Sequence, residues 1–362
     1  MPIRILHVVG ARPNFMKVAP VMHAMAGDAR FEQFLVHTGQ HYDAELSDVF
    51  LDELDLPEPY ANLGVGSGTH AKQVADVMTR LDDVLVTLAP DWVLVPGDVN
   101  STLAAALVAV KRGCGVAHLE AGLRSRDLTM PEEINRILVD RVATLLLTPS
   151  RDADDNLVAE GVDRSQIAFV GNAMIDTLVR LLPRAEAGWP ALRGRFGVDR
   201  YVAVTLHRPV NVDDPVAFAP IAAALTEISA TIDVVFPMHP RTRERCGAAF
   251  ADAPRVRIVE PLGYVDFLAL EAHAAVVLTD SGGIQEETTF LGVPCLTLRR
   301  TTERPVTVTE GTNRLVEREQ AAIVDAVRAA LAAPRLPAAA PELWDGHTAE
   351  RVVDALVRIS RP

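Results

Sequence analysis

The feature that most constrains the fold is an alternation of short apolar runs with longer amphipathic segments, which occurs twice along the chain. Apolar runs such as 3–9, 92–96 and 145–148 predict buried strands, and the segments between them predict helices. Strands that alternate with helices favour parallel sheets with helices on both faces. With 362 residues the chain is too long for one ordinary core. We therefore expect an α/β protein with two doubly wound, Rossmann-like domains facing each other across a cleft.

A looser segment, 181–198, separates the two series of strands. It contains two prolines and three glycines, which predicts an irregular connection. We expect an N-terminal domain over 1–170 and a C-terminal domain over 171–345. A Pro- and Ala-rich crossover at 332–343 precedes a last amphipathic helix at 348–359, and we expect the segment 346–362 to join the first domain.

Composition narrows the classes of partner. The net charge of -13 disfavours nucleic acid and acidic membranes as partners. No apolar run reaches the length of a membrane span, and the chain enters a strand at once, which is unlike a signal peptide. The three cysteines are scattered, so their spacing predicts neither a disulfide framework nor a zinc site. We expect a cytoplasmic protein without metal.

Polar residues follow the expected strands in both domains. Ligands bind beyond the carboxyl ends of the strands in doubly wound sheets, so these residues are candidates for a site. They include Arg12, Lys17, Gln40, His41, Asp98, Glu120, His207, Arg208, His239 and Ser281. A whole rim of such residues favours an enzyme.

The turn Ser281-Gly282-Gly283 lies between an apolar strand and a helix. Backbone N–H groups at such a helix start, approached closely because of the glycines, predict a phosphate or diphosphate site. The alternative is an ordinary strand–helix turn with a serine cap. Arg12 and Lys17 lie at the first strand–helix turn, where they would meet an anion or simply face solvent. The chain has no Gly-x-Gly-x-x-Gly motif and no P-loop, which disfavours a nicotinamide cofactor.

Three acids are candidates for proton transfer. Asp98 follows a strand and a glycine, so it is either a general base or a helix cap that competes with Ser101. Glu120 sits between strand residues and a small-residue turn, where an unpaired acid is rare; Arg124 is its alternative, structural partner. Glu132 begins a helix and gains from the helix dipole even without a catalytic role.

Two histidines stand at strand ends. His207 precedes Arg-Pro, and His239 is flanked by prolines, so we expect both in the cleft rather than as ordinary strand-end histidines. His37 and His41 straddle a turn instead of sharing a helix face, and no set of residues has convincing metal spacing.

The motifs described above, taken together with further stretches of the chain, resemble those of a known protein family. Over nearly its whole length the chain resembles the non-hydrolysing UDP-N-acetylglucosamine 2-epimerase family. The matching stretches are 10–13 with Lys17, 38–41, 97–98, 118–124, 131–136, 171–172, 207–208, 239–240, 279–287, 302–305 and 311–312. The resemblance implies a GT-B-like pair of domains, a closing hinge and a homodimer.

The resemblance also implies a reaction. The family interconverts UDP-GlcNAc and UDP-ManNAc without NAD or metal, by eliminating UDP to a 2-acetamidoglucal and adding it back. Such chemistry needs a cationic, N–H-rich site for the departing UDP, acids and bases at the sugar, and a closed site.

Roles carry over by resemblance onto the matching positions. Asp98, Glu120 and Glu132 correspond to the acid/base residues, and His207 assists at the diphosphate. The residues similar to UDP-sugar contacts are Arg12, Lys17, His239, Phe267, Ser281, Gly282, Gly283, Glu287 and Arg304. Among these, Glu287 would accept hydrogen bonds from the ribose, Phe267 would lie at the uracil, and Arg304 would contact the sugar. Gln40, His41 and Arg208 resemble part of a second site, at which UDP-GlcNAc activates bacterial members.

Departures from the family pattern leave alternatives open. Asn14 replaces an acid, Pro209 follows Arg208, and Arg299-Arg300 is unusually basic. A related branch acts on UDP-linked 2,3-diacetamido glucuronic acids, whose extra carboxylate needs a cation that Arg299 or Arg300 would supply; an exposed pair is the plainer interpretation. A hydrolysing epimerase that releases ManNAc and UDP is a second alternative. A catalytically silent UDP-sugar-binding regulator and a GT-B glycosyltransferase complete the set.

Overall fold

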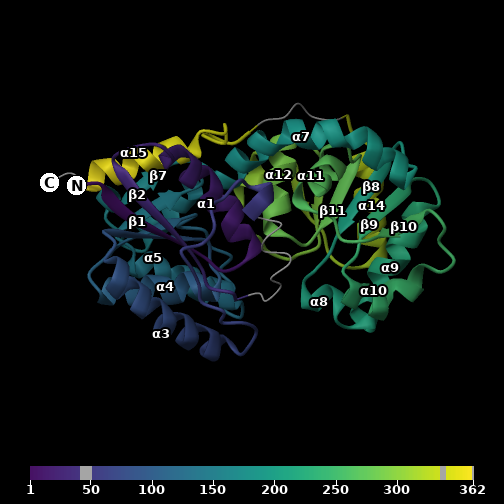
Figure 1. The fold of residues 1–362 in the computed structure, drawn as a ribbon. Coiled ribbons are helices and arrows are strands. Elements are labelled where there is room, and N and C mark those ends of the chain that lie inside the picture. Colours follow the sequence, from purple (N-terminus) through teal and green to yellow (C-terminus); the bar gives the residue numbers. More distant parts are fainter. Residues whose placement is uncertain (41–50, 335–339, 361–362) are drawn as a thin grey trace. The chain divides into compact units, whose positions relative to one another are not determined.

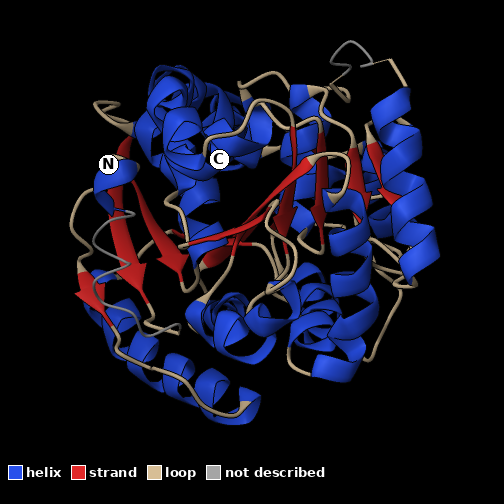
Figure 2. Ribbon diagram, turned by 90° about the vertical axis from the view of Figure 1, so that its right-hand side faces the viewer, coloured by secondary structure: helices blue, strands red, loops and turns tan. Residues whose placement is uncertain are grey.

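The computed structural model describes residues 1–40, 51–334 and 340–360. The chain divides into two compact units (Figure 1). Unit 1 comprises Met1–Thr177 with Glu342–Pro362, and unit 2 comprises Leu178–Pro341. Each unit contains one sheet of parallel strands, and helices surround the strands (Figure 2). The predicted α/β class with two doubly wound domains is confirmed. The assignment of acid/base work to one domain and UDP binding to the other stays a prediction.

The sheet of unit 1 has the order β3-β2-β1-β4-β5-β6-β7. Its strands are β1 (Ile3–Val9), β2 (Phe31–His37), β3 (Ala61–Asn62), β4 (Trp92–Pro96), β5 (Gly115–Leu119), β6 (Leu145–Thr148) and β7 (Ile167–Phe169). The strand order reverses between β1 and β4. At such a reversal the loops after the two strands turn to opposite faces of the sheet and leave a crevice for a ligand.

Helices cover both faces of this sheet. They are α1 (Arg12–Met25), α3 (His70–Leu88), α4 (Asn100–Lys111), α5 (Pro131–Val142), α6 (Arg151–Ala159) and α15 (Thr348–Ser360), with the 3-10 turn η1 (Arg164–Gln166). On one face α3, α4 and α5 lie side by side, and on the other α1 packs with α15 (Figure 1). Val77 and Leu81 of α3, Ala105 of α4 and Val139 of α5 are fully buried in one core cluster. The last helix was predicted over nearly the same residues.

The sheet of unit 2 has the order β10-β9-β8-β11-β12-β13. Its strands are β8 (Tyr201–Thr205), β9 (Asp233–Pro237), β10 (Val256–Val259), β11 (Val276–Thr279), β12 (Cys295–Thr297) and β13 (Asn313–Leu315). The helices are α8 (Pro209–Val212), α9 (Pro215–Ser229), α10 (Pro240–Cys246), α11 (Tyr264–Ala272), α12 (Gly282–Leu291), α13 (Val306–Thr309) and α14 (Gln320–Ala332), with the 3-10 turn η2 (Gly247–Phe250). The order reverses between β8 and β11, so the ends of these strands form the second expected ligand position.

The prediction of an irregular connection at 181–198 is wrong. This stretch belongs to α7 (Ala173–Phe196), a helix that includes Pro183 and Pro190. Buried positions recur along it at helical spacing: Leu178, Leu181, Ala185, Trp189, Leu192 and Phe196. Both prolines lie on the exposed side. Burial of the periodic apolar face therefore outweighs the cost of the missing backbone hydrogen bonds.

Two further predictions lie partly outside the described residues, namely a helix at 44–53 and the crossover at 332–343. In the part of the chain that the structure describes, no helix is both long and apolar enough to cross a bilayer.

Candidate active site

The first group of predicted residues meets where the strand order of unit 1 reverses. β4 and β5 pair in register, with Pro96 opposite Leu119. The Gly97 amide then donates to the Leu119 carbonyl at 2.9 Å. Asp98 and Glu120 therefore follow neighbouring strands at the same edge of the sheet.

Glu120 is held in an uncommon backbone conformation. Its φ is 75°, in the left-handed region, and its amide donates to the Leu147 carbonyl at 3.0 Å. A non-glycine residue in this region stores about 1–3 kcal/mol of strain and is concentrated at functional sites. Only 9% of the residue is exposed. This backbone conformation fixes the direction in which the buried side chain of Glu120 leaves the loop after β5.

The carboxylate of Glu120 pairs with Lys17 of α1. Lys17 is itself buried, so each charge compensates the other away from water. The alternative partner considered from the sequence, Arg124, is wrong for Glu120. Arg124 instead pairs with Asp140 at 2.7 Å and with Glu160 at 2.7 Å.

Gly97 allows this pair to lie against the chain. A Cβ at Gly97 would stand 3.1 Å from Lys17 Nζ and 3.3 Å from Glu120 Oε2. Its φ of 65° also favours glycine. Asn14 fixes the neighbouring turn, because its side chain accepts from the Gly10 and Ala11 amides at 3.0 Å and donates to the Pro96 carbonyl at 3.1 Å.

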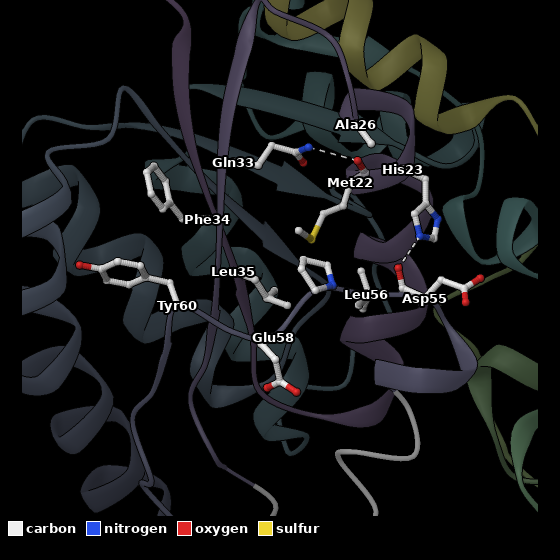
Figure 3. A pocket seen from close by; sticks show the side chains of 11 residues that line it. Met22, His23, Ala26, Gln33, Phe34, Leu35, Asp55, Leu56, Glu58 and Tyr60 are labelled. Carbon is white, nitrogen blue, oxygen red and sulfur yellow. Dashed lines mark hydrogen bonds between the residues drawn. The ribbon is translucent and has the colours of Figure 1, made fainter.

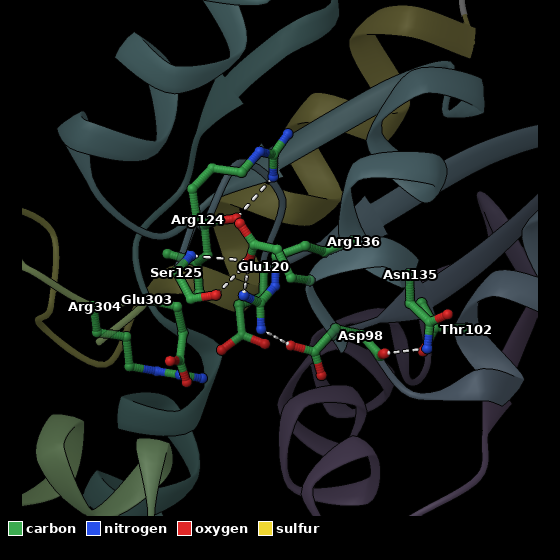
Figure 4. Close-up of polar contacts among 12 residues, drawn as sticks. Asp98, Thr102, Glu120, Arg124, Ser125, Asn135, Arg136, Glu303 and Arg304 are labelled. Atoms are coloured by element: carbon green, nitrogen blue, oxygen red, sulfur yellow. Dashed lines mark hydrogen bonds and ion pairs between the residues drawn. The ribbon is translucent and has the colours of Figure 1, made fainter. Parts of the chain in front are cut away.

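Asp98 has its own cation. It pairs with Arg136 of α5, which also pairs with the buried Glu133 (Figure 4). The N-cap of the following helix, α4, is Val99, so Asp98 does not occupy the cap position. Asn135 donates to the Asp98 carbonyl at 2.9 Å and fixes the loop. Glu132, the third predicted acid, is exposed in the first turn of α5.

A buried histidine braces the loop that carries Asp98. His118 is fully buried; its Nδ1 lies 2.6 Å from Asp140 and its Nε2 lies 2.8 Å from the Gly97 carbonyl. Burial alone raises the pKa of Asp140, but interactions with His118 and Arg124 outweigh burial, so this pKa lies below its ordinary value. Asp140 thus stays ionised and connects the loops after β4 and β5.

The remaining predicted residues of unit 1 differ in exposure. Arg12 is exposed at the start of α1. Gln40 is buried, and its side-chain oxygen accepts from the Ser101 amide at 2.9 Å and from the Ser101 hydroxyl at 2.7 Å. His41 lies outside the described residues.

In unit 2 the corresponding position is organised by Asp280, which follows β11. Asp280 is fully buried and accepts from the amides of His207 at 3.1 Å and Arg208 at 3.0 Å, and from Asn211 Nδ2 at 2.8 Å. His207 Nδ1 lies 3.0 Å from the same carboxylate. Burial alone raises the pKa of Asp280, but the bonds from His207, Asn211 and the Arg208 amide outweigh it and leave a lowered pKa. The contact with Asp280 orients the His207 ring, and the His207 side chain remains 62% exposed, so a ligand can reach it.

The predicted anion site is the N-terminus of α12. Ser281 is its N-cap residue, as the alternative of a serine cap expects, but its side chain makes no capping hydrogen bond. A Cβ at Gly282 would stand 2.5 Å from Arg304 Nη1 and 2.8 Å from Glu303 Oε1. Arg304 also pairs with Glu286 at 2.8 Å. The backbone at Gly282 therefore lies against a fixed guanidinium, next to the first free N–H groups of the helix.

The other predicted contacts of unit 2 lie on different elements. Glu287, on α12, is 2% exposed and accepts from the Tyr264 hydroxyl at 2.8 Å. Phe267 is half-buried on α11, and His239 is exposed just before α10. Arg299 pairs with Glu303 at 2.6 Å inside the unit, whereas Arg300 is exposed.

One cavity of unit 1 lies away from these residues. It has a volume of about 740 Å³ and is lined by α1, β2 and the segment 55–60, including Met22, His23, Leu35, Glu58 and Tyr60 (Figure 3). Most of its lining is apolar, and none of the predicted residues lines it. Among the described residues, no group of three or more acidic, histidine or cysteine side chains is arranged to hold a metal ion.

Sequence reasoning missed several residues that support the site. Arg136 could have been found, because it lies three positions after Glu133 on a predicted helix. Asn211 lies two positions after Pro209, in the stretch that departs from the family pattern, and was not selected. Asp140 and Glu303 had no local signal, since each acts through residues from other elements.

Comparison with known proteins identifies relatives of this chain. The family model for UDP-N-acetylglucosamine 2-epimerase matches residues 23–357. The chain is 40% identical to a UDP-N-acetylglucosamine 2-epimerase of Methanocaldococcus jannaschii, over 88% of this chain and 90% of the relative. It is 42% identical to a UDP-2,3-diacetamido-2,3-dideoxy-D-glucuronate 2-epimerase of Pseudomonas aeruginosa, over 91% and 92%.

Solved structures extend the likeness to three dimensions. The crystal structure of the Methanocaldococcus jannaschii UDP-GlcNAc 2-epimerase in complex with UDP-GlcNAc and UDP superimposes with a TM-score of 0.90 at 38% identity, covering 98% of this chain and 100% of that one. The resemblance noted from the motifs is thus confirmed: the chain belongs to the UDP-N-acetylglucosamine 2-epimerase family, a family of isomerases.

Proposed function

We propose that the protein reversibly epimerises UDP-GlcNAc at C2 to UDP-ManNAc, without net hydrolysis. The observation that carries this proposal is the pair of carboxylates at the ends of β4 and β5, Asp98 and Glu120, each beside its own cation. Each carboxylate is paired with a basic side chain, Glu120 with Lys17 and Asp98 with Arg136, and carboxyl groups are common acid/base residues. The relative crystallised with UDP-GlcNAc and UDP supports the choice of nucleotide sugar.

The proposed reaction begins with loss of UDP. The C1–O bond breaks, and UDP leaves with the bonding electrons while a carboxylate removes the C2 proton. A 2-acetamidoglucal results, because the C–H electrons form the C1–C2 double bond. A second acid then protonates C2 on the opposite face as UDP adds back to C1. Two faces need proton transfer, which fits more than one carboxylate among Asp98, Glu120 and the exposed Glu132.

The proposed role of unit 2 is to stabilise the departing UDP. His207, oriented by Asp280, supplies a donor to the diphosphate, and the N–H groups at Ser281-Gly282-Gly283 favour negative charge. Arg12, Arg304 and His239 are proposed contacts of the UDP-sugar, Phe267 of the uracil, and Glu287 of the ribose.

Proton NMR in deuterated water tests the reaction. Purified protein with UDP-GlcNAc should yield UDP-ManNAc, and deuterium should enter C2 of both sugars. Unchanged substrate would contradict the proposal. Free ManNAc and UDP formed in equal amounts would identify a hydrolysing enzyme instead.

A second candidate substrate is a UDP-linked 2,3-diacetamido glucuronic acid, favoured by the 42% identity to the Pseudomonas aeruginosa enzyme. The two arginines considered for the extra carboxylate are differently placed. Arg299 is buried in its ion pair with Glu303, whereas Arg300 lies 3.6 Å from Glu317 in an exposed pair, so Arg300 is the more accessible cation for this role. The same NMR assay with both substrates, compared by kcat/KM, distinguishes the candidates.

Activation and assembly are further parts of the proposal. We propose that UDP-GlcNAc activates the enzyme through a site that includes Gln40, His41 and Arg208, and that the protein is a homodimer. A trace of UDP-GlcNAc should accelerate the initial rate with UDP-ManNAc, and sedimentation should give twice the chain mass. No acceleration, or a monomer, would contradict the respective proposal.

A further inference from the structure

Unit 2 buries a carboxyl group that the proposed mechanism does not use. Glu271 lies in the last turn of α11 and is 0% exposed. Among the described residues, no donor hydrogen-bonds either of its side-chain oxygens. An ionised carboxylate in this position would have lost its hydration without replacement, which strongly favours the neutral acid.

The groups that face Glu271 come from two neighbouring elements. They are the carboxyl of Glu287 on α12, which lies within hydrogen-bonding reach, and the thiol of Cys295 on β12. Burial and then the charge of Glu287 raise the pKa of Glu271 well above its ordinary value. Burial also raises the pKa of Cys295 to about 11, so the thiol stays neutral. Carboxylate oxygens only accept hydrogen bonds, so two carboxyls in contact need a proton between them.

The surroundings decide which of the two acids holds this proton. Glu287 accepts from the Tyr264 hydroxyl at 2.8 Å, and this bond stabilises its ionised form. Glu271 receives no such donor. This difference favours the proton on Glu271, from which it could be donated to Glu287. An ionised carboxylate has about four lone-pair positions, so these two bonds alone do not exhaust the capacity of Glu287 to accept hydrogen bonds.

We propose that Glu271 is a protonated positioning residue that, together with Tyr264, holds Glu287 as the ionised acceptor for vicinal hydroxyls of a nucleoside diphosphate sugar. The choice of ligand rests on the proposed function. The shared proton rests only on the arrangement of Glu271, Glu287 and Tyr264. The two parts are therefore tested separately.

The first test measures protonation without ligand. In wild type, the unfolded chain releases the Glu271 proton above its ordinary pKa, while the folded protein keeps it. Stability from this group is fully present below that pH and is lost as pH rises toward the folded pKa. Glu271→Gln has no proton to release, so its Tm should exceed that of wild type by a margin that grows roughly 2–4 °C per pH unit above pH 5.

The exposed Glu244→Gln of the same unit is the matched control, and its Tm should follow wild type at each pH. An infrared difference spectrum of wild type minus Glu271→Gln at neutral pH should show a protonated carboxyl band. A carboxylate band, or a Tm margin that does not change with pH, would overturn the shared proton.

The second test measures the effect on ligand binding. Glu271→Gln keeps a donor toward Glu287, whereas Glu271→Leu has similar bulk and none. Calorimetry with UDP should show Kd raised roughly tenfold in Glu271→Leu, and most of that loss recovered in Glu271→Gln. Equal losses in both variants would overturn the positioning role. Failure of wild type to bind UDP would contradict the proposed function but leave the first test valid.

Discussion

The two units hold carboxylates at equivalent places in their sheets but pair them with different kinds of group. In unit 1, Glu120 and Asp98 pair with the side-chain cations of Lys17 and Arg136. In unit 2, Asp280 is held mainly by backbone amides, together with the side chains of Asn211 and His207. A side-chain cation can turn toward an incoming ligand, whereas a backbone amide cannot. We infer that the acids of unit 1 suit proton transfer and that Asp280 serves as a fixed support.

The largest expected effect comes from removing one of the acids of unit 1. Glu120→Gln removes a proposed base, so kcat should fall by about 10²–10⁴-fold while UDP-sugar binding survives. The NMR assay and calorimetry measure the two quantities. Full retention of activity would refute the role of Glu120.

This variant leaves Lys17 buried without its partner, which by itself costs about 3–5 kcal/mol of stability. The double variant Lys17→Met/Glu120→Gln removes the uncompensated charge and should recover stability without recovering turnover. Glu350→Gln, at an exposed position on α15, is the control for the general effect of a Glu→Gln substitution, and its activity and stability should match wild type.

The next largest effect is a loss of stability when Asp280, the fixed carboxylate of unit 2, is removed. Asp280→Ala leaves the His207 and Arg208 amides without an acceptor and should lower the free energy of unfolding by about 3 kcal/mol at neutral pH. Because the folded pKa of Asp280 is lowered, its stability is present above the ordinary aspartate value and is lost as pH falls through the folded pKa. The gap between wild type and variant should therefore shrink in acid. A gap that stays constant across chemical denaturation from pH 7 to pH 3 would contradict this account.

Both units also show which parts of the fold and of the site could be predicted from the sequence. Strand bounds such as 3–9 and 92–96 were predicted correctly because buried parallel strands are continuous apolar runs. The strand-tip rule then selected Asp98, Glu120 and His207 without any contact information. The placement of these residues follows from sheet topology, and their catalytic roles stay predictions.

What the sequence did not predict depends on long-range contacts. Lys17 and Glu120 are 103 residues apart, and only the strand order brings them together. The short strands β3 and β13 have too few residues for a periodic signal. The helix α7 was missed because its prolines were weighed as breakers, although the apolar positions between them recur at helical spacing.

A smaller effect tests the close packing at Gly97. Gly97→Ala would bring a methyl group to within 3.1 Å of Lys17 Nζ, so it should displace the Lys17–Glu120 pair. We expect kcat to fall roughly 10–100-fold, since small misplacements of catalytic groups have effects of this size. The control is Gly113→Ala, which has a comparable φ of 78° but no atom within 4 Å of the added Cβ. Equal activity losses would show that backbone strain, rather than displacement of the pair, is responsible.

The smallest effect concerns the start of α12. A Cβ at Gly282 would stand 2.5 Å from Arg304 Nη1, so Gly282→Ala must shift the guanidinium or the first turn of the helix. The Kd for UDP should rise roughly 5–10-fold, because one charge-assisted contact is weakened rather than lost. Gly194→Ala, in α7, has open space around its Cβ and should leave the Kd unchanged while stabilising the helix by about 0.5–1 kcal/mol. If Gly282→Ala binds UDP as tightly as Gly194→Ala does, the N-terminus of α12 does not contact the diphosphate, and unit 2 must hold it through His207 instead.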